Sequence, residues 1–333
     1  MEPSEDRCPL CTPEDPPKEV RVETTSSRAP SVRYRPSRLG EVRGHDAIKS
    51  NLSILITAAK RRGSALPHLL FSGPPGLGKT TLALVTGAEM GTPVLQLGGD
   101  SAPVAMMREI LLSRLTPGAV LFIDEIHRLN GPVVELLYRP MEDGIALIDG
   151  KETRLPPFTV VGATTNPGRI SAPMRQRFRE RFHVDFLDIG ALATAAWYAA
   201  ESYDISLTKA ACVEIATRAK GTPRRVVRFV AWIADCTLAT KNGHGGKTLG
   251  VSDVDGALLR LRIGREGFDP TDRRYLSALA DQFAGGPVGV KALAAALSEE
   301  QDTVEREIEP WLVSQGYVQL TAKGRALGPG PVS

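Results

Sequence analysis

The octapeptide GPPGLGKT, from Gly73 to Thr80, matches the pattern G-x-x-x-x-G-K-[S/T] of phosphate-binding loops. It follows an apolar run at 68–72, which predicts a strand, and it opens a helix predicted over 79–90. The alternative is a Gly/Pro turn that carries Lys-Thr by chance. Such a turn does not require a strand before it and a helix after it, and both are predicted here. The stretch therefore predicts a P-loop within an α/β domain.

Each residue type in this loop has a physical task. Gly73, Gly76 and Gly78 allow backbone N–H groups to surround a phosphate without Cβ clashes, and the helix N-terminus adds partial positive charge. Lys79 is expected to reach the β- and γ-phosphates of ATP, and the hydroxyl of Thr80 is expected to ligate Mg²⁺. ATP and Mg²⁺ are therefore the predicted cofactors.

A second chemical signal follows the P-loop by roughly 45 residues, the order expected of a P-loop NTPase. The apolar run Val120–Ile123 ends in the carboxylates Asp124 and Glu125. Asp124 is expected to hold Mg²⁺ through water, and Glu125 is placed to polarise the attacking water as a general base. The alternative is that Asp124 and Glu125 merely end a strand at the solvent-exposed surface, but the P-loop favours the catalytic interpretation.

The rest of the chain alternates between strand-like and helix-like segments up to residue 188, which is typical of a parallel sheet covered by helices. Predicted strands are 68–72, 93–97, 120–124, 159–163 and 184–186. Predicted helices of this part are 46–62, 79–90, 104–115 and 133–143.

From residue 189 the pattern becomes helical, with amphipathic stretches at 191–202, 209–219, 223–239 and 252–262 and no strand signal between them. From residue 267, helices at 271–283, 290–297 and 303–314 precede a hairpin at 317–320 and 325–327, the composition of a winged helix. We expect an α/β nucleotide domain at 31–188, a helical lid domain at 189–266 and a winged-helix DNA-binding domain at 267–333.

Composition excludes some classes of protein. The chain of 333 residues has 42% hydrophobic and 24% charged residues, which is normal for a globular protein. Lys and Arg number 41 against 38 for Asp and Glu, so a protein that merely coats nucleic acid is excluded and any DNA contact must be local. No apolar run reaches 18 residues, which argues against a membrane span.

The N-terminal segment 1–30 is acidic and rich in proline, and we expect it to be a flexible leader. Cys8 and Cys11 have the spacing of half a zinc site, but no second pair completes it, so a fragment of a mobile tail is the competing interpretation. Four cysteines in a chain of this length fit a reducing cytoplasm.

An ordered set of motifs resembles the RuvB branch-migration ATPases of the AAA+ superfamily. The similarity extends from about residue 31 to about residue 328 and leaves only the leader outside. The motifs that carry it are GPPGLGKTT at 73–81, LFIDEIHRL at 121–129, MED at 141–143, LPPF at 155–158, GATT at 162–165, GTPR at 221–224 and GGPVG at 285–289.

The resemblance implies roles that spacing alone does not supply. Thr164 resembles the sensor 1 residue that positions the attacking water, and Asn166 is an alternative. Arg177 resembles the arginine finger, which reaches the γ-phosphate of a neighbouring subunit in a homo-hexamer; a solvated basic face is the other interpretation. Arg224 resembles sensor 2, which reaches the nucleotide from the lid domain. Thr81 completes the P-loop motif.

The resemblance also places Tyr34 and Arg35 on the adenine side of the nucleotide. It implies double-stranded DNA or a four-way junction as the substrate of the winged helix, with Arg325 and Lys323 on the wing as contact residues. Where the family tends to carry a second arginine on this wing, the chain has Leu320. The wing is the only locally cationic part of this unit, because carboxylates outnumber basic residues in the unit as a whole.

One departure from the family concerns the partner. Between Asp143 and Leu155, relatives carry a hydrophobic β-hairpin that docks the junction-binding protein RuvA. Here the segment 144–154 is several residues shorter, and its apolar residues are Ile145, Leu147 and Ile148. A RuvA-like partner is thus implied by the resemblance, whereas the short segment argues for a trimmed or retargeted contact.

Three functional hypotheses follow. The first is a hexameric motor that hydrolyses ATP to translocate double-stranded DNA and drive branch migration of Holliday junctions. The second is a clamp-loader or helicase-loader ATPase that remodels a protein on DNA. The third is a scaffold that binds ATP without turnover. The motif at 285–289 and the winged-helix tail favour the motor, and Lys79, Glu125 and Arg177 argue against the scaffold.

Overall fold

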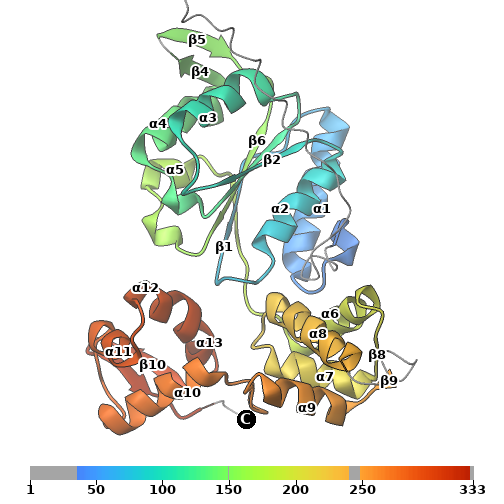
Figure 1. Ribbon diagram of the computed structural model, residues 1–333. Coiled ribbons are helices and arrows are strands. Elements are labelled where there is room, and N and C mark those ends of the chain that lie inside the picture. Colours follow the sequence, from blue (N-terminus) through green and yellow to red (C-terminus); the bar gives the residue numbers. More distant parts are fainter. Residues whose placement is uncertain (1–35, 149, 240–247, 331–333) are drawn as a thin grey trace, which may run out of the picture.

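The computed structural model describes residues 36–148, 150–239 and 248–330. Its elements form three groups, an α/β group that includes the P-loop, a helical group and a C-terminal group (Figure 1). The predicted leader, Cys8, Cys11, Tyr34 and Arg35 lie outside the described residues. None of the helices described has both the length and the apolar content that a membrane crossing requires.

A five-stranded parallel sheet lies at the centre of the α/β group, with the strand order β2-β3-β6-β1-β7. The strands are Leu69–Ser72 (β1), Val94–Gly98 (β2), Val120–Asp124 (β3), Thr159–Thr164 (β6) and Glu180–His183 (β7). Since all strands are parallel, their carboxyl ends share one edge of the sheet. This edge therefore collects the loop after β1, Asp124 and Glu125 after β3, and Thr164 at the end of β6.

Helices cover both faces of this sheet (Figure 1). The helices are Asp46–Arg62 (α1), Lys79–Met90 (α2), Val104–Glu109 (α3, which continues as a π-helical turn over Ile110–Arg114), Gly131–Asp143 (α4) and Ala172–Gln176 (α5). Strand residues alternate between the faces: Leu69 and Phe71 join the core beneath α1 and α2, whereas Leu70 joins the core beneath α3 and α4. The predicted α/β architecture is confirmed.

The last strand differs from the prediction. The apolar segment 184–186 is not a strand, and β7 is formed instead by Glu180–His183. Because β7 is an edge strand with β1 as its one neighbour, only Phe182 needs to be buried, and charged residues are tolerated beside it. The search for an apolar run, which marks a buried strand, therefore placed this strand at 184–186 and was wrong.

The second group consists of four helices, Ile189–Ser202 (α6), Lys209–Arg218 (α7), Pro223–Leu238 (α8) and Val251–Arg260 (α9), which share one hydrophobic core. It also has a short parallel pairing that the sequence did not predict, between Ser206–Leu207 (β8) and Thr248–Leu249 (β9). Two residues per strand are too few to show an alternating pattern.

The C-terminal group has the predicted winged-helix composition. Arg325 in the hairpin exchanges two backbone hydrogen bonds of 2.8 Å with Val288, which attaches the wing to the segment before α11. The elements are Pro270–Ser277 (α10, continued by a π-helical turn over Ala278–Gln282), Val290–Leu297 (α11), Gln301–Thr303 (α12), a π-helical turn over Val304–Ile308, Glu309–Ser314 (α13), Val318–Thr321 (β10) and Gly324–Leu327 (β11).

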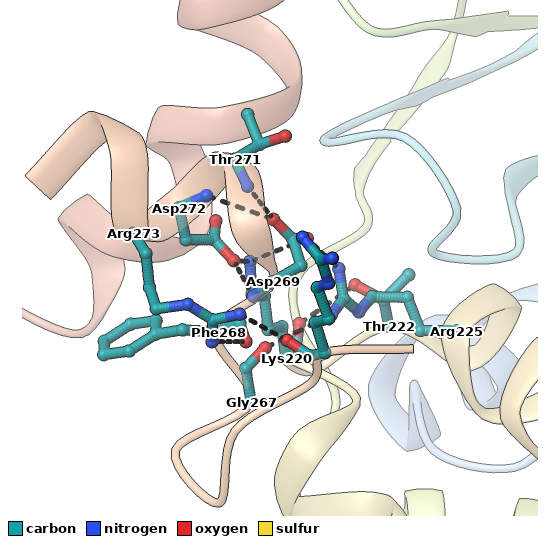
Figure 2. Close-up of polar contacts among 10 residues, drawn as sticks. Lys220, Thr222, Arg225, Gly267, Phe268, Asp269, Thr271, Asp272 and Arg273 are labelled. Carbon is teal, nitrogen blue, oxygen red and sulfur yellow. Dashed lines mark hydrogen bonds and ion pairs between the residues drawn. The ribbon is translucent and has the colours of Figure 1, made fainter. Parts of the chain in front are cut away.

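A cluster of ion pairs joins the helical group to the winged helix (Figure 2). The ammonium of Lys220, before α8, pairs with Asp272 of α10, and Nη1 of Arg225 in α8 donates to Asp269 at 3.0 Å. Asp269 also caps α10 by accepting from the backbone N–H of Asp272 at 3.0 Å. We call Lys220, Arg225, Asp269 and Asp272 the domain latch.

The central ion pair of the latch is buried. Lys220 and Asp272 are both buried, and burial lowers the pKa of Lys220 despite the nearby carboxylates. Burial also raises the pKa of Asp272, while at Asp269 the opposing effect of Lys220 and Arg225 outweighs burial and holds the pKa well below its usual range. Removing one partner from such a set leaves an uncompensated buried charge, so breaking this contact between the two domains is costly.

Candidate functional site

The P-loop connects β1 to α2 and depends on glycine at three positions. Gly73, Gly76 and Gly78 have φ values of 140°, 79° and 93°, which L-residues with a Cβ rarely adopt. A Cβ on Gly73 would lie 2.1 Å from the carbonyl oxygen of Val184, and one on Gly76 would lie 2.8 Å from Cγ2 of Thr222. The loop is thus fitted closely against the residue that follows the edge strand β7 and against the start of α8.

Lys79 is the first residue of α2, and its side chain folds back over the loop. Its Nζ donates to the carbonyl oxygens of Gly73 at 2.7 Å and of Pro74 at 2.8 Å. Burial lowers the pKa of this ammonium to about 8, with Glu125 and Asp124 opposing the shift. The cation therefore lies in the mouth of the phosphate cradle, held by groups that a phosphate can replace.

Thr80 and Asp124 meet across the carboxyl edge of the sheet. Oγ1 of Thr80 lies 3.3 Å from Oδ2 of Asp124, and Oδ1 of Asp124 accepts from the backbone N–H of Glu125 at 3.1 Å. A hydroxyl and a carboxylate are the hard oxygen ligands that Mg²⁺ prefers, and Mg²⁺ normally completes its coordination with water and phosphate. The residues present therefore fit the metal that the sequence predicts.

Glu125 follows β3 in the left-handed region, with φ 47°. Its Oε2 accepts from the backbone N–H of Thr165 at 3.0 Å and from Oγ1 of Thr165 at 2.9 Å. Glycine at position 99 leaves room for the left-handed backbone of Glu125, because a Cβ there would lie 2.2 Å from the carbonyl oxygen of Glu125. The carboxylate is thus fixed at the carboxyl edge between β3 and β6.

Thr164, expected as sensor 1 with Asn166 as the alternative, and its neighbour Thr165 have different contacts. Thr164 is fully buried, and its Oγ1 lies 2.9 Å from Nδ1 of His127 and accepts from the backbone N–H of Asn166 at 3.0 Å. Thr165, not Thr164, contacts Glu125 directly. Both positions are threonine, so the sequence alone could not show which of the two contacts Glu125.

A cleft of about 700 Å³ joins these groups to the helical domain. The P-loop from Pro75 to Thr81, Asp124 and Glu125 line one side, and Arg224 with the apolar residues Val227 and Ala231 of α8 lines the other. The backbone N–H of Arg224 donates to the carbonyl oxygen of Gly76 at 3.3 Å. The volume and the combination of apolar and polar lining are those of a small-molecule site.

Two residues of this cleft were not found from the sequence. His45 precedes α1, and its Nε2 lies 3.0 Å from the carbonyl oxygen of Leu77; burial lowers its pKa. The guanidinium of Arg43 lies over the ring of Tyr198 in α6, 4.3 Å from the centroid. Both precede the P-loop by about 30 residues in a segment without a motif, so only the three-dimensional structure brings them to the cleft.

Comparison with known proteins identifies this arrangement. Residues 34–184 match the model of the Holliday junction DNA helicase RuvB P-loop domain, and residues 265–332 match that of the RuvB C-terminal winged helix domain. A curated relative from Lactobacillus helveticus, named Holliday junction branch migration complex subunit RuvB, is 40% identical over 91% of this chain and 89% of its own length. The chain belongs to the RuvB family.

Other relatives of the RuvB family agree. The protein of the same name from Paramagnetospirillum magneticum is 42% identical over 88% of this chain and 86% of its own length. The solved structure of the Thermotoga maritima RuvB Holliday junction branch migration motor has a TM-score of 0.81 and 39% identity, covering 89% of this chain and 95% of its own. These matches include all three groups of elements.

Arg177, expected in this RuvB-family chain to act on a neighbouring subunit, does not line the cleft formed by the described residues. It lies after α5 with its guanidinium over the ring of Tyr138, 4.3 Å from the centroid. Nη1 donates to the carbonyl oxygen of Pro173 at 2.8 Å, and Nη2 donates to Glu142 at 2.5 Å. Arg177 is thus held in one orientation at a surface away from its own chain's nucleotide cleft.

The two wing residues differ in availability. Lys323 is exposed at the hairpin turn. Arg325 is only 16% exposed, because its guanidinium donates to Glu305 at 2.8 Å and to the two carboxylate oxygens of Glu309 at 2.9 and 3.1 Å. Glu309 is buried and also accepts from the hydroxyl of Tyr275. The charge of Arg325 is therefore shared with carboxylates of its own domain.

Two short strands lie in the segment 144–154, where the resemblance implies a shortened partner hairpin. Ile145–Ile148 (β4) and Lys151–Arg154 (β5) pair as an antiparallel hairpin at the end of the α/β domain far from the winged helix (Figure 1). Ala146 and Ile148 are buried in the domain core, whereas the side chain of Leu147 is 48% exposed. The short hairpin thus offers a small apolar contact instead of an extended one.

Proposed function

We propose that this chain is the ATP-driven motor of Holliday junction branch migration, acting as a ring of six copies on double-stranded DNA. The observation that carries the proposal is the continuity from nucleotide to winged helix. Arg224 lines the nucleotide cleft, and Arg225, the next residue, is ion-paired to Asp269 of the winged-helix domain. A nucleotide that moves the start of α8 therefore moves the DNA-binding domain as well.

ATP hydrolysis by this chain is assigned to the groups at the carboxyl edge. Lys79 and the backbone N–H groups of the P-loop bind the phosphates, and Arg224 approaches them from the lid domain. Glu125 accepts a proton from the attacking water, and Thr165, which fixes the glutamate, takes the sensor role in preference to Thr164. When bound, Mg²⁺ held by Thr80 and Asp124 would neutralise phosphate charge.

The placement of Arg177 supports the proposed ring. A guanidinium fixed by Tyr138 and Glu142 at a surface of the domain suits a finger that stabilises charge at the next subunit's nucleotide. Because that finger and the cleft lie on different parts of one chain, six copies in a closed ring would each complete the site of a neighbour. Contacts from several subunits add up on the DNA, so each winged helix needs few free cations.

We assign the short hairpin to a RuvA-type partner. The exposed Leu147 at the end of the α/β domain is the apolar side chain available for such a contact. Leu147→Asp is expected to weaken the complex with a RuvA-type protein by at least about tenfold, which a pull-down or sedimentation experiment would measure, while the basal ATPase rate stays at the parent value.

The test is a synthetic four-way junction assay with purified chain, ATP and a RuvA-type protein. Branch migration by the parent chain, and its loss in Glu125→Gln with ATP binding retained, are the expected results. Parent chain that hydrolyses ATP but transfers a sliding clamp or a replicative helicase onto DNA, without moving junctions, would replace the motor by a loader. Absence of ATP hydrolysis under every condition would support the scaffold hypothesis.

A further inference from the structure

His127 occupies a position between the ends of β3 and β6. It lies in a short 3-10 turn, Ile126–Arg128, and its side chain is 1% exposed. Its Nδ1 is 3.1 Å from Oε2 of Glu125 and 2.9 Å from Oγ1 of Thr164. One ring atom therefore connects the proposed general base to the strand that carries the sensor.

The chemistry of these neighbours fixes the proton on the ring. Nδ1 lies 3.1 Å from a carboxylate oxygen, which can only accept, so a lone pair at Nδ1 would repel it. We therefore assign the hydrogen to Nδ1, where it also serves the hydrogen bond to Oγ1 of Thr164. Nε2 is buried and has no hydrogen-bond partner within the described part of the chain. A neutral ring with its lone pair at Nε2 avoids a buried, unpaired N–H, and burial lowers the pKa of His127 in the same direction.

The two oxygens of Glu125 are consequently unequal. Oε2 accepts hydrogen bonds from the backbone N–H and from Oγ1 of Thr165, and Nδ1 of His127 lies 3.1 Å from the same oxygen. Oε1 accepts no hydrogen bond from any residue that the structure describes. Three polar groups thus converge on one oxygen and leave the other to receive a proton from water.

We infer that His127 is a positioning residue for ATP hydrolysis, which fixes the carboxylate of Glu125 through the polar contact of Nδ1 with Oε2. The inference rests on the proposed function, because it gives the general base its orientation. The competing explanation is that His127 only fills space between β3 and β6. The two explanations differ in which substitutions preserve turnover.

Three substitutions at this one position separate them. The amide nitrogen of Asn can occupy the place of Nδ1, that of Gln extends toward the place of Nε2, and Leu fills the volume without a donor. We expect His127→Asn to keep kcat within about threefold of the parent, and His127→Gln and His127→Leu to lose at least about tenfold, because misplacing a catalytic group by about 1 Å costs up to about a hundredfold. The Kd of a fluorescent ADP analogue should stay within about twofold in all three, since ground-state binding does not use Glu125.

Equal losses in the Asn and Leu variants, or parent-level turnover in the Leu variant, would overturn the inference. A measurement on otherwise intact protein covers the case in which the variants do not fold. In protein with ¹⁵N-labelled histidine, one of the five imidazoles should show a protonated Nδ1 that shifts when Glu125 is replaced by Gln. No such shift would also reject the contact. A parent chain without ATPase activity would reject the proposed function instead, and the labelled imidazole would still report on the contact.

Discussion

Arg224 and Arg225 are consecutive residues in the first turn of α8, and they contact different domains. Arg224 faces the nucleotide cleft and donates its backbone N–H to Gly76 of the P-loop, whereas the guanidinium of Arg225 binds Asp269 and the carbonyl oxygen of Gly267. One helical turn therefore belongs both to the nucleotide site and to the attachment of the winged helix.

This relationship predicts different defects in two neighbouring variants. Arg224→Met should weaken ATP hydrolysis itself, because the proposed contact of this guanidinium with phosphate would be lost. Arg225→Met should leave basal hydrolysis unchanged and reduce its stimulation by four-way-junction DNA, because the winged helix is less firmly attached to α8. The ratio of ATPase rates with and without junction DNA is the measurement. An Arg225→Met chain that is stimulated as strongly as the parent would contradict the coupling.

The domain latch predicts a large stability effect. Lys220→Met leaves the buried carboxylate of Asp272 without its ammonium, which should lower the free energy of unfolding by about 3–5 kcal/mol. Adding Asp272→Asn should restore part of this loss, because the amide needs no counterion. Urea unfolding of the parent, the single variant and the double variant gives the comparison, and a double variant no more stable than Lys220→Met would argue against a buried charge as the cause.

The depressed pKa of Lys79 predicts that nucleotide affinity depends on pH. Burial lowers this pKa to about 8, so the nucleotide-free ammonium loses its proton as pH rises through that value. Phosphate binding favours the charged form, so affinity for ATP should be constant below the pKa, should fall above it, and should be accompanied by proton uptake there. Titration calorimetry in buffers of different ionisation enthalpy measures both. Lys79→Arg, whose side chain stays charged, is the control and should show no such fall.

Thr165 and Thr164 provide a further comparison within one motif. Thr165→Val removes the hydroxyl donor to Glu125 but keeps the backbone N–H, and we expect kcat to fall about tenfold with little change in nucleotide Kd. Thr164→Val affects Glu125 only through His127 and should have a smaller effect on kcat. The opposite order in steady-state kinetics would return the sensor role to Thr164.

The wing offers two cations with different surroundings. Arg325→Met removes the main partner of the buried Glu309 and should lower the free energy of unfolding by about 2–3 kcal/mol, measured by thermal unfolding. The same substitution should also weaken DNA binding. Lys323→Met should leave the melting temperature unchanged, weaken junction binding and reduce the slope of log affinity against log salt by about one. Unaltered stability in Arg325→Met would show that its carboxylate contacts are unimportant for the fold.

The local motifs were the most predictable part of the molecule. The P-loop and the pair Asp124 and Glu125 are each contiguous, and parallel strands bring their ends together by geometry alone. The strand at 120–124 and the helices at 46–62, 79–90 and 290–297 have the predicted bounds, since each combines a clear apolar period with a clear start and end.

Features that depend on tertiary contact could not be predicted in this way. Whether Thr164 or Thr165 meets Glu125 depends on the direction of each side chain at the end of β6. The carboxylates that hold Arg325 come from the turn before α13 and from α13 itself, 20 and 16 residues away. The edge strand β7 was misplaced because exposure on an edge removes the apolar pattern that marks a buried strand.

Because the domain latch attaches the winged helix to the lid domain, the two would rotate together relative to the α/β domain. The pivot of this rotation would be the segment 184–188, which leaves the sheet after β7 and is attached to the lid by the hydrogen bond from the backbone N–H of Leu187 to the carbonyl oxygen of Gly221. Displacement in a rotation grows with distance from the pivot, so the wing would move farther than α8. The ion pair between Arg169 and Asp302, at 3.8 Å and partly exposed, is weak enough to break at each stroke. In the proposed motor, a small change at the γ-phosphate would thereby become a longer step along DNA.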